Sequence, residues 1–372
     1  MKVLYFTHGF SSHDRRFLEA LGGTTHTIEY LPLLADLSQN ANSELPASVH
    51  GHPALYGGHS LAWYRYPEAS HRFDERIEQI QPDLIHAGPI HLSAVVAALA
   101  GFHPLVSMSW GSDLLWEARK PWVNLLARYT LKRSDAFVGD CLAVQQAAVR
   151  LGMGADRIVL FPWGTDLDHF SPRSEGGLRA ELGWQEQFVL ISTRTFEPLY
   201  GVDLIVQAFI RASQQHPQLR LLLLGDGSQR EGMKRWLIDA GLADKAYFAG
   251  SVSRDDLPNY YRSADLYLSA SHSDGSSVSL LEAMACGLPA LVSDIPGNRE
   301  WVAPGVNGWW FRSGEADSLV ASVKKVLGSD KCKAMGIAAR SIAEQRADWS
   351  ENFPKLLDAY ELARKHHARS SL

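Results

Sequence analysis

Short apolar runs recur along the first half of the chain, and most of them stop at a glycine or a polar loop. Runs of this length that are rich in β-branched and aromatic residues predict strands buried in a parallel sheet. Segments with helical spacing or with small residues lie between them. The predicted strands are residues 2–8, 83–86, 105–109, 136–139 and 158–161, and the predicted helices are residues 15–21, 92–100 and 114–133. Alternating strands and helices indicate a doubly wound parallel sheet.

Residues 161–172 (FPWGTDLDHFSP) interrupt this pattern, with prolines near both ends and a glycine between them. We interpret the segment as an interdomain linker. The alternation then restarts, with predicted strands at 188–193, 219–224, 246–249, 266–269 and 290–293. The predicted helices are residues 204–213, a helix that follows the 219–224 strand and ends at about residue 240, and residues 257–262 and 278–286. The chain is therefore divided into domains at 1–165 and 173–348. A last helix is expected at 352–366, and residues 350–372 are assigned to the first domain.

Composition narrows the class of protein. The 372 residues include 36 Lys+Arg and 41 Asp+Glu, which gives a net charge of −5. This balance argues against a general nucleic-acid binder, although it leaves room for a local basic pocket. Three widely separated cysteines and an amino terminus unlike a signal peptide favour a reduced, cytoplasmic protein. The histidine pairs 50/52 and 366/367 lack the spacing of a zinc site, so no metal is expected.

The most informative segment is residues 273–287, where Asp274 and Glu282 are eight positions apart. A small polar loop opens there into a helix, and the free N–H groups at such a helix start suit a phosphate or diphosphate. Glu282 lies in an otherwise apolar stretch, where an unpaired carboxylate is costly. The paired hydroxyls of a ribose would satisfy it. The alternative is a structural role, as a helix cap or as the partner of a residue such as Arg299.

Two further loops follow strands in the second domain. Arg194 comes directly after a predicted strand, where a fixed guanidinium can neutralise a diphosphate, although a surface ion pair is the usual alternative for an arginine. Gly225 and Gly227 flank Asp226 after another strand. Arg230 stands where a third glycine would fall, so the dinucleotide fingerprint is incomplete, which argues against a nicotinamide-dependent dehydrogenase.

In the first domain the strand-end loops are residues 8–10, 86–88 and 110–113, each of which combines a glycine with polar or aromatic groups. Single histidines such as His8 and His86 are often structural. Residues 114–133 mix aromatic and basic side chains. Such a helix can lie on an anionic membrane, but we prefer the interpretation that it is a solvated helix packed on the sheet.

The segment SDGSSVSLLEAMACGLPALVSD (273–294) resembles the donor-binding signature of the family 4 retaining glycosyltransferases. Supporting motifs occur in the family's order and span nearly the whole chain: PDLIHAG, FPWGTDLDHFSP, TFEPLYGVDLIVQAF, LLLLGDGSQRE and FAGSVSRDDLPNYYRSADLYLSAS. The resemblance implies the GT-B arrangement, an α/β fold of two facing Rossmann-like doubly wound domains whose C-terminal helix crosses back to the first domain. It also implies a nucleotide-diphosphate sugar as co-substrate, with a UDP- or GDP-sugar favoured, retention at the anomeric carbon, and neither metal nor cofactor.

The resemblance also suggests roles for individual residues. It implies three catalytic residues: Arg194 at the diphosphate, Asp274 at the hydroxyls of the transferred sugar and Glu282 at the ribose. The remaining donor-binding residues are Gly9, Gly227, Ser251, Val252, Ser276, Ser277 and Val278. The acceptor-side residues are Phe10, Arg15, His86, Trp110 and Asp113.

The chain departs from the family pattern at three places. Tyr200 occupies the neighbourhood of a family lysine, Trp110 replaces a family histidine, and Gly9-Phe10 replaces a glycine pair. The sequence offers Arg230, Lys234 and Arg254 as substitutes for the lysine and does not choose between them.

The sequence thus predicts a cytoplasmic retaining glycosyltransferase with a glycan, lipid-linked or small-molecule acceptor, and it leaves open a contact with the cytosolic membrane face. A nucleotide-sugar epimerase or hydrolase on the same fold is one alternative, and a nucleotide-sugar-binding protein without catalysis is another. Neither the oligomeric state nor the identities of the sugar, base and acceptor follow from the sequence.

Overall fold

The computed structural model describes residues 1–35, 45–58, 60–173 and 177–370. The chain folds into two compact units. The first comprises Met1–Phe161 together with Phe353–Leu372, and the second comprises Pro162–Asn352. Phe170, from the segment interpreted as a linker, is buried in the core of the second unit.

The first unit is built on a parallel sheet. In the described residues its seven strands have the order β3-β2-β1-β4-β5-β6-β7. The strands are β1 (Lys2–Thr7), β2 (Thr27–Pro32), β3 (Val49–Gly51), β4 (Leu84–Gly88), β5 (Leu105–Met108), β6 (Ala136–Gly139) and β7 (Ile158–Leu160). The central strands β1 and β4 are almost wholly buried, as is usual for strands covered on both faces of a parallel sheet.

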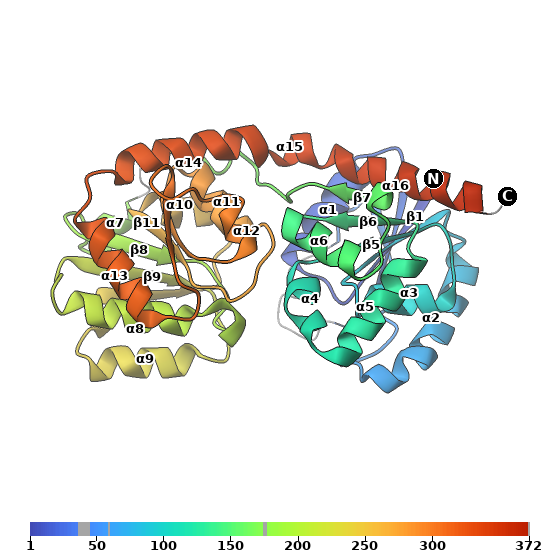
Figure 1. The fold of residues 1–372 in the computed structure, drawn as a ribbon, viewed down its shortest axis with the longest axis horizontal. Helices are drawn as coiled ribbons and strands as arrows, with labels where there is room; N and C mark the ends of the chain where they lie inside the picture. Colours follow the sequence, from blue (N-terminus) through green and yellow to red (C-terminus); the bar gives the residue numbers. More distant parts are fainter. Residues whose placement is uncertain (36–44, 59, 174–176, 371–372) are drawn as a thin grey trace. The chain divides into compact units, whose positions relative to one another are not determined.

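Helices cover both faces of this sheet (Figure 1). Helices α2, α3 and α5 pack side by side on one face, and α16 packs on β5, β6 and β7. The helices are α1 (Ser12–Gly22), η1 (Trp63–Arg65), α2 (Tyr66–Ile80), α3 (Ser93–Ala100), α4 (Ser112–Leu115), η2 (Glu117–Arg119), α5 (Pro121–Arg133), α6 (Leu142–Arg150), η3 (Ala155–Arg157) and α16 (Pro354–Ser370).

The second unit repeats the architecture. Its described part has a six-stranded parallel sheet in the order β10-β9-β8-β11-β12-β13. The strands are β8 (Phe188–Ser192), β9 (Leu219–Leu224), β10 (Ala246–Gly250), β11 (Leu266–Ser269), β12 (Ala290–Ser293) and β13 (Gly308–Phe311).

Two apolar cores flank the second sheet. One joins it to α8 and α13, and the other joins it to α11 and α14 (Figure 1). The helices are α7 (Leu178–Glu181), η4 (Pro198–Tyr200), α8 (Val202–Ser213), α9 (Arg230–Asp239), η5 (Ala243–Lys245), α10 (Leu257–Arg262), α11 (Val278–Ala285), α12 (Pro296–Arg299), α13 (Ala316–Leu327), α14 (Cys332–Arg346) and α15 (Trp349–Asn352).

Each sheet reverses its strand order at one place, between β1 and β4 in the first unit and between β8 and β11 in the second. Ligands of open α/β sheets bind at such a point, outside the carboxyl ends of the strands. We call the side of a sheet where its strands end the carboxyl edge, and the side where they begin the amino edge. The loops that follow β8 and β11 are therefore the first place to look for a binding site.

The predicted fold class is confirmed, because each unit is doubly wound and the last helix returns to the first sheet. The single helix predicted at 114–133 is wrong: the chain forms α4, η2 and α5 there, and the last of these restarts at Pro121. A proline fits the first helical turn but not a helix interior, which explains the break. The predictions also omitted α2, whose 15 residues carry few apolar positions.

Among the described residues, no helix has both the length and the apolar character needed to cross a membrane.

Candidate functional site

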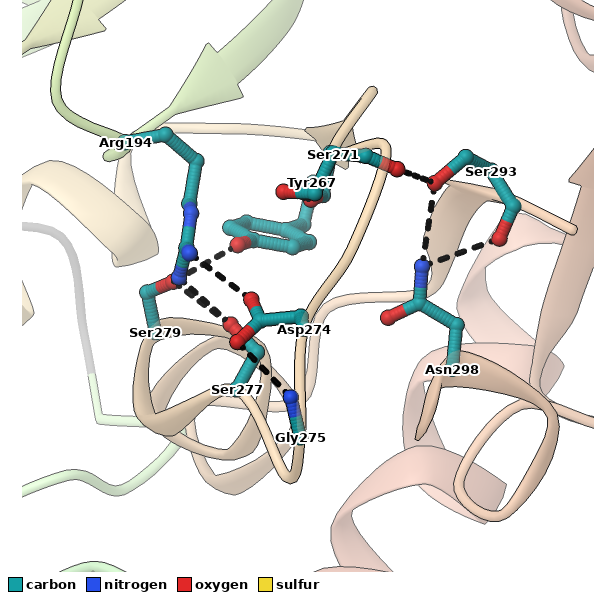
Figure 2. Close-up of polar contacts among 10 residues, drawn as sticks. Arg194, Tyr267, Ser271, Asp274, Gly275, Ser277, Ser279, Ser293 and Asn298 are labelled. Carbon is teal, nitrogen blue, oxygen red and sulfur yellow. Dashed lines mark hydrogen bonds and ion pairs between the residues drawn. The ribbon is translucent and has the colours of Figure 1, made fainter. Parts of the chain in front are cut away.

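Arg194 lies two residues beyond β8 and enters a buried polar cluster at the carboxyl edge of the second sheet (Figure 2). Its Nη2 atom forms an ion pair of 2.7 Å with Oδ2 of Asp274, in the loop after β11. Its Nη1 atom donates to Oγ of Ser277 at 2.8 Å and to Oγ of Ser279 at 3.1 Å. The side chain of Arg194 is only 12% exposed, so this is not a surface ion pair.

Burial sets the electrostatics of this pair. Burial raises the pKa of the Asp274 carboxyl, although the charge of Arg194 opposes the shift. Burial lowers the pKa of Arg194, but the charge of Asp274 outweighs it, and the pKa lies above its ordinary value. Nε of Arg194 is also buried, and no described residue accepts a hydrogen bond from it. Because buried donors are rarely left unpaired, this N–H group is a candidate donor to an anionic ligand.

Tyr200 completes the surroundings of Arg194. The Tyr200 ring centroid lies 4.3 Å from Cζ of Arg194, which is a cation–π contact. The next residue, Gly201, has a φ of 59°, and a Cβ atom there would collide with the backbone oxygen of Ala270. The glycine therefore lets the loop after β8 approach the end of β11. At the position where the family pattern has a lysine, this chain places an aromatic ring under its arginine.

Hydrogen bonds from several elements hold the loop of Asp274 (Figure 2). The Gly275 N–H donates to Oδ1 of Asp274 at 3.0 Å, and Nε1 of Trp301 donates to Oγ of Ser276 at 3.0 Å. The hydroxyl groups of Tyr267 and Ser279 lie 2.8 Å apart. On the far side, Asn298 donates to the backbone oxygen of Ser293, whose hydroxyl donates to Ser271. The loop is thus fixed before any ligand arrives.

The amino end of α11 opens beside this cluster. Ser277 is the N-cap residue, but its side chain makes no capping hydrogen bond because the hydroxyl is engaged by Arg194 and Ser279. The first turn of a helix has N–H groups without intrahelical partners, and it carries a partial positive charge. Val278, the first residue of α11, and the Arg194 guanidinium therefore place two positive features side by side.

Glu282 lies one turn into α11 and is partly buried. Its Oε2 atom accepts a hydrogen bond of 2.9 Å from the hydroxyl of Tyr261, a fully buried tyrosine. Arg299, the partner proposed for Glu282 in the structural alternative, instead forms a two-pronged bond with Asp294. The pairing of Glu282 with Arg299 is therefore wrong.

The remaining donor-binding candidates lie on neighbouring loops of the same edge. Gly227 follows β9, and a Cβ atom there would lie 2.7 Å from the backbone of Phe196. Because it has no Cβ atom, Gly227 lets the loop after β9 lie close to that segment. Ser251, directly after β10, is exposed, and Val252 packs partly against the core around α11.

The three basic residues offered in place of the missing lysine have carboxylate partners of their own. The pairs are Arg230–Asp226 at 2.7 Å, Lys234–Glu231 at 3.2 Å and Arg254–Asp166 at 3.2 Å. None of these pairs involves Arg194 or Asp274. In the structure, the residue of this neighbourhood that contacts Arg194 is Tyr200, through its ring.

At the carboxyl edge of the first sheet, aromatic side chains dominate. Phe10, in the loop after β1, meets the ring of Tyr30 edge-on at 5.7 Å. Trp110, after β5, lies 5.5 Å from the ring of His13 and 6.1 Å from that of Phe17. Gly9 lies beside Phe10 and is partly buried.

Three acceptor-side candidates have other surroundings. His86 is fully buried, with Nδ1 2.9 Å from the hydroxyl of Tyr360, and burial lowers its pKa to about 3. Asp113 is buried and accepts hydrogen bonds from Ser109 and from the N–H groups of residues 90 and 114. Arg15 is exposed and pairs with Glu19. His86 is thus hydrogen-bonded to α16, and Asp113 holds the backbone at residue 90 and at the start of α4.

Sequence reasoning missed Tyr267 and Ser279, which support Arg194 and Asp274 from β11 and α11. Ser279 lies inside the motif that was singled out, and its spacing from Ser277 was the available signal. Tyr267 reads as an ordinary residue of a buried strand, and nothing in the sequence distinguishes its hydroxyl.

Two family models match the chain. The model described as glycosyltransferase family 4 matches residues 13–169, and the model described as glycosyl transferases group 1 matches residues 177–352.

Curated relatives and solved structures agree with these matches. D-inositol 3-phosphate glycosyltransferase of Segniliparus rotundus is 27% identical over 97% of this chain and 80% of its own. GDP-mannose-dependent alpha-(1-6)-phosphatidylinositol monomannoside mannosyltransferase of Mycolicibacterium smegmatis is 23% identical over 73% of this chain and 74% of its own. The crystal structure of Anabaena Alr3699/HepE in complex with UDP covers 97% of this chain and all of its own, with a TM-score of 0.79 at 20% identity, which shows the shared fold.

Proposed function

The chain belongs to family 4 of the retaining glycosyltransferases, the group 1 glycosyl transferases with the GT-B fold, and from this membership we propose specific roles for the cluster around Arg194. The enzyme transfers a sugar from a nucleotide-sugar donor to an acceptor hydroxyl. The observation that carries our proposal is the buried guanidinium of Arg194, which lies beside the start of α11 and has an unpaired Nε.

Arg194 and the first turn of α11 bind the donor diphosphate. As the sugar–phosphate bond breaks, negative charge grows on the departing diphosphate. A buried guanidinium and oriented N–H groups stabilise that charge without needing to reorganise. Because Asp274 already holds Arg194, the diphosphate competes with this carboxylate for the guanidinium. Donor binding therefore loosens Asp274 and lets its oxygens turn to hydroxyl groups of the transferred sugar.

Glu282 binds the ribose of the nucleotide. Its carboxylate accepts from Tyr261, which fixes one oxygen, and an ionised carboxylate can accept hydrogen bonds from the paired hydroxyls of a ribose. The backbone N–H groups of Ser276, Ser277 and Val278 face the phosphates or the sugar. Gly227, Ser251 and Val252 line the nucleotide end of the same edge.

In the chemical step, the acceptor oxygen attacks the anomeric carbon on the same face of the sugar from which the diphosphate departs. The bond between the anomeric carbon and the phosphate oxygen breaks, and the bond to the acceptor oxygen forms. The proton of the acceptor hydroxyl passes to the departing phosphate oxygen. Arg194 stays charged throughout, so it contributes electrostatic stabilisation and no proton.

The acceptor binds at the loops of the first unit around Phe10 and Trp110, and we propose an inositol-bearing or lipid-linked acceptor. Support comes from the relatives, whose names include an inositol phosphate and a phosphatidylinositol mannoside. The aromatic faces of Phe10 and Trp110 suit the C–H faces of a cyclic polyol. Arg15 adds a cation near the same loop.

A lipid-linked acceptor implies contact with a membrane surface, and α5 and η1 offer the residues for it. Trp122 and Leu125 on α5 are 47% and 68% exposed, and Trp63 and Tyr64 on η1 are likewise exposed. Arg119, Lys120 and Arg128 flank the α5 pair. Exposed aromatic residues beside cations are typical of surfaces that bind anionic bilayers.

The proposed function is tested by a donor screen. The purified chain is incubated with UDP, GDP, ADP, CDP and their sugars, and thermal unfolding is recorded, because a ligand that binds the folded state raises the melting temperature. We expect a selective shift with a UDP- or GDP-based ligand and release of that nucleotide only when an inositol-bearing or lipid-linked acceptor is present. Release or epimerisation without acceptor would instead favour a hydrolase or epimerase. Tight binding with no turnover would favour a non-catalytic binding protein.

The membrane contact has its own test. Binding to vesicles that contain anionic phospholipid is compared for the natural chain and for Trp122→Ser/Leu125→Ser. The matched control is Trp236→Ser, which changes an exposed tryptophan on α9 of the second unit. We expect the α5 variant to lose most of its binding and the control to keep it. Equal losses in both would remove α5 from the proposal.

A further inference from the structure

A cluster of histidines surrounds one carboxylate at the amino edge of the first sheet. His103 lies just before β5, and Asp135 lies directly before β6, the neighbouring strand. Helix α16 packs on both strands and brings His366 and His367 to the same place. Three segments that are distant in sequence thus meet here, which is why histidine spacing alone gave no sign of them.

Asp135 is the centre of this cluster. Its side chain is 4% exposed. Oδ2 accepts from Nδ1 of His103 at 2.6 Å and from the Leu105 N–H at 2.8 Å, and Oδ1 accepts from Nδ1 of His366 at 3.0 Å. Burial raises the pKa of Asp135, but these hydrogen bonds outweigh it, and the pKa lies below its ordinary value. A charged, oriented carboxylate is therefore held among imidazoles.

His367 supplies the third group. Its ring stacks on that of His103, with centroids 5.7 Å apart and planes inclined by 7°. One nitrogen from each of these histidines and one oxygen of Asp135 all lie within 4.8 Å of one another. Ligand atoms around tetrahedral Zn²⁺, with bonds of about 2.0–2.2 Å, are about 3.3 Å apart. The rings of His103 and His367 are partly exposed, so small rotations can close the difference.

We propose that His103, Asp135 and His367 bind one divalent first-row transition-metal ion, with Zn²⁺ the best chemical match, and that this ion fastens α16 to the first sheet. Two imidazoles and a carboxylate form a ligand set that zinc accepts, with water in the remaining position. His103 offers the nitrogen that now faces Asp135, and the proton of that nitrogen moves through solvent to Nε2. The ligands then carry one negative charge against the two positive charges of the ion.

The neighbours of Asp135 fit this role. His366 and the Leu105 N–H hold the carboxylate from outside the ligand set. Such partners orient metal ligands and are part of most metal sites. His366 is therefore a positioning residue in the proposal, and the ion itself touches the other three side chains.

An approach for the ion exists on the same side of the first unit. A cavity of 610 Å³ is lined by His367 and Pro104, together with His26, Asp83, Glu361 and Arg364. Burial lowers the pKa of His26 in this cavity, which favours its neutral, metal-binding form. The cavity opens where the strands of the first sheet begin, at the edge opposite the loops of Phe10 and Trp110. The proposed ion is thus structural, and sugar transfer does not pass through it.

The test uses the full chain, freed of any histidine tag and of metal by chelation. Zn²⁺ is titrated in against a chromophoric chelator, and Co²⁺ is titrated separately while its visible absorption is recorded. We expect one equivalent to bind, with the strong visible bands of four-coordinate Co²⁺. In His103→Ala/His367→Ala the affinity should fall at least about 100-fold, since even the loss of an outer partner costs about 10- to 100-fold.

Two controls make the result decisive. His71→Ala, which removes an exposed histidine on α2, should bind Zn²⁺ as the natural chain does. The single variant His367→Ala serves if the double variant unfolds, and the metal-free melting temperature of each variant reports its folding. Addition of Zn²⁺ should raise the melting temperature of the natural chain and of His71→Ala only. Absence of stoichiometric binding, or an affinity of His367→Ala equal to that of the natural chain, would overturn the proposal. The cluster would then be only a hydrogen-bonded contact between α16 and the first sheet.

Discussion

The two sheets reverse their strand order in the same way, yet the side chains at the two reversals have opposite character. Beyond β8 and β11 the second unit gathers a buried cation, a carboxylate and serine hydroxyls, centred on Arg194. Between β1 and β4 the first unit buries His86 against Tyr360 and Tyr5 against Asp14. Each cluster holds one buried nitrogen without a described hydrogen-bond partner, Nε of Arg194 and Nε2 of His86, but only the arginine carries a charge.

This difference separates topology from chemistry. A parallel sheet provides the same kind of crevice wherever its order reverses. What binds there depends on the charges at the strand ends. A buried guanidinium with an unpaired donor suits a diphosphate, while the aromatic loops of the first unit suit an acceptor with C–H faces. Four substitutions test this contrast, beginning with the one that should matter most.

Arg194→Ala removes the charge that the proposal assigns to the departing diphosphate. We expect turnover to fall by about two to three orders of magnitude, the usual cost of deleting a stabilising donor in a transition state. The measurement is the initial rate of sugar transfer at saturating donor. Because Asp274 would be left buried and unpaired, thermal unfolding is recorded for the same sample.

Arg194→Lys is the matched control, because it keeps the charge but loses the planar fork that reaches Ser277 and Ser279. It should recover part of the lost rate. A near-natural rate in Arg194→Ala would remove Arg194 from the mechanism.

The contrast also explains which features the sequence could predict. Arg194, Asp274 and Glu282 stand at strand ends or within one continuous motif, so local pattern was enough to single them out, and the structure brings Arg194 and Asp274 together. The partner of His86 is Tyr360, 274 residues away on α16, and no local pattern can indicate such a contact. The sequence therefore assigned His86 to the acceptor side from its place at a strand end, and its burial beside Tyr360 became visible only in the structure.

The same limit applies beyond His86. His103 and Asp135 meet His367 only because α16 returns to the first sheet. Tyr200 shows a different limit. Its position was recognised as a departure from the family pattern, but its contact with Arg194 depends on the turn at Gly201. The predictions found the central strands of both sheets from their short apolar runs, but they omitted the outer strands β2 and β13 and the helices α2, α6, α13 and α14.

His86 gives the second prediction, in the first unit. Its pKa falls from 6.5 to about 3 on burial, so the folded protein keeps it neutral while the unfolded chain protonates it below pH 6.5. Stability is therefore lost as the pH falls from about 6.5 toward 3. One proton of difference corresponds to about 1.4 kcal/mol per pH unit. His86→Gln should lose this contribution and show a shallower acid limb in denaturant unfolding.

Asp14 has the opposite effect on stability. Burial raises its pKa from 3.8 to about 6, so its contribution to the free energy of unfolding is lost as the pH rises from about 3.8 to about 6. The difference between the natural chain and His86→Gln at each pH is therefore the quantity to read, because Asp14 is common to both. His71→Gln, at an exposed position, is the control. A stability difference that does not change with pH, combined with a raised KM for acceptor, would contradict this prediction and support the acceptor-side assignment of His86.

Glu282→Gln is the third prediction, and it tests the ribose assignment in the second unit. Replacing a carboxylate by an amide weakens charge-assisted hydrogen bonds, so we expect about a tenfold loss of affinity for the free nucleoside diphosphate. The sharper measurement compares ribose and 2′-deoxyribose nucleotides by calorimetry. The natural chain should distinguish the two and Glu282→Gln should not. Tyr261→Phe, which removes the fixed partner of Glu282, should distinguish the two nucleotides less well than the natural chain but better than Glu282→Gln.

Tyr200 gives the smallest expected effect and the finest test of the contrast. Its ring lies under Arg194 where the family pattern has a lysine, and a partly buried cation–π contact is worth about 1 kcal/mol. Tyr200→Ala should therefore lower kcat/KM for the donor about fivefold, while Tyr200→Phe, which keeps the ring, should match the natural chain. If the hydroxyl rather than the ring mattered, Tyr200→Phe would lose activity as well. Retained activity in both variants would mean that Arg194 is positioned by Asp274 and the serines alone, and the aromatic replacement would then have no part in binding the diphosphate.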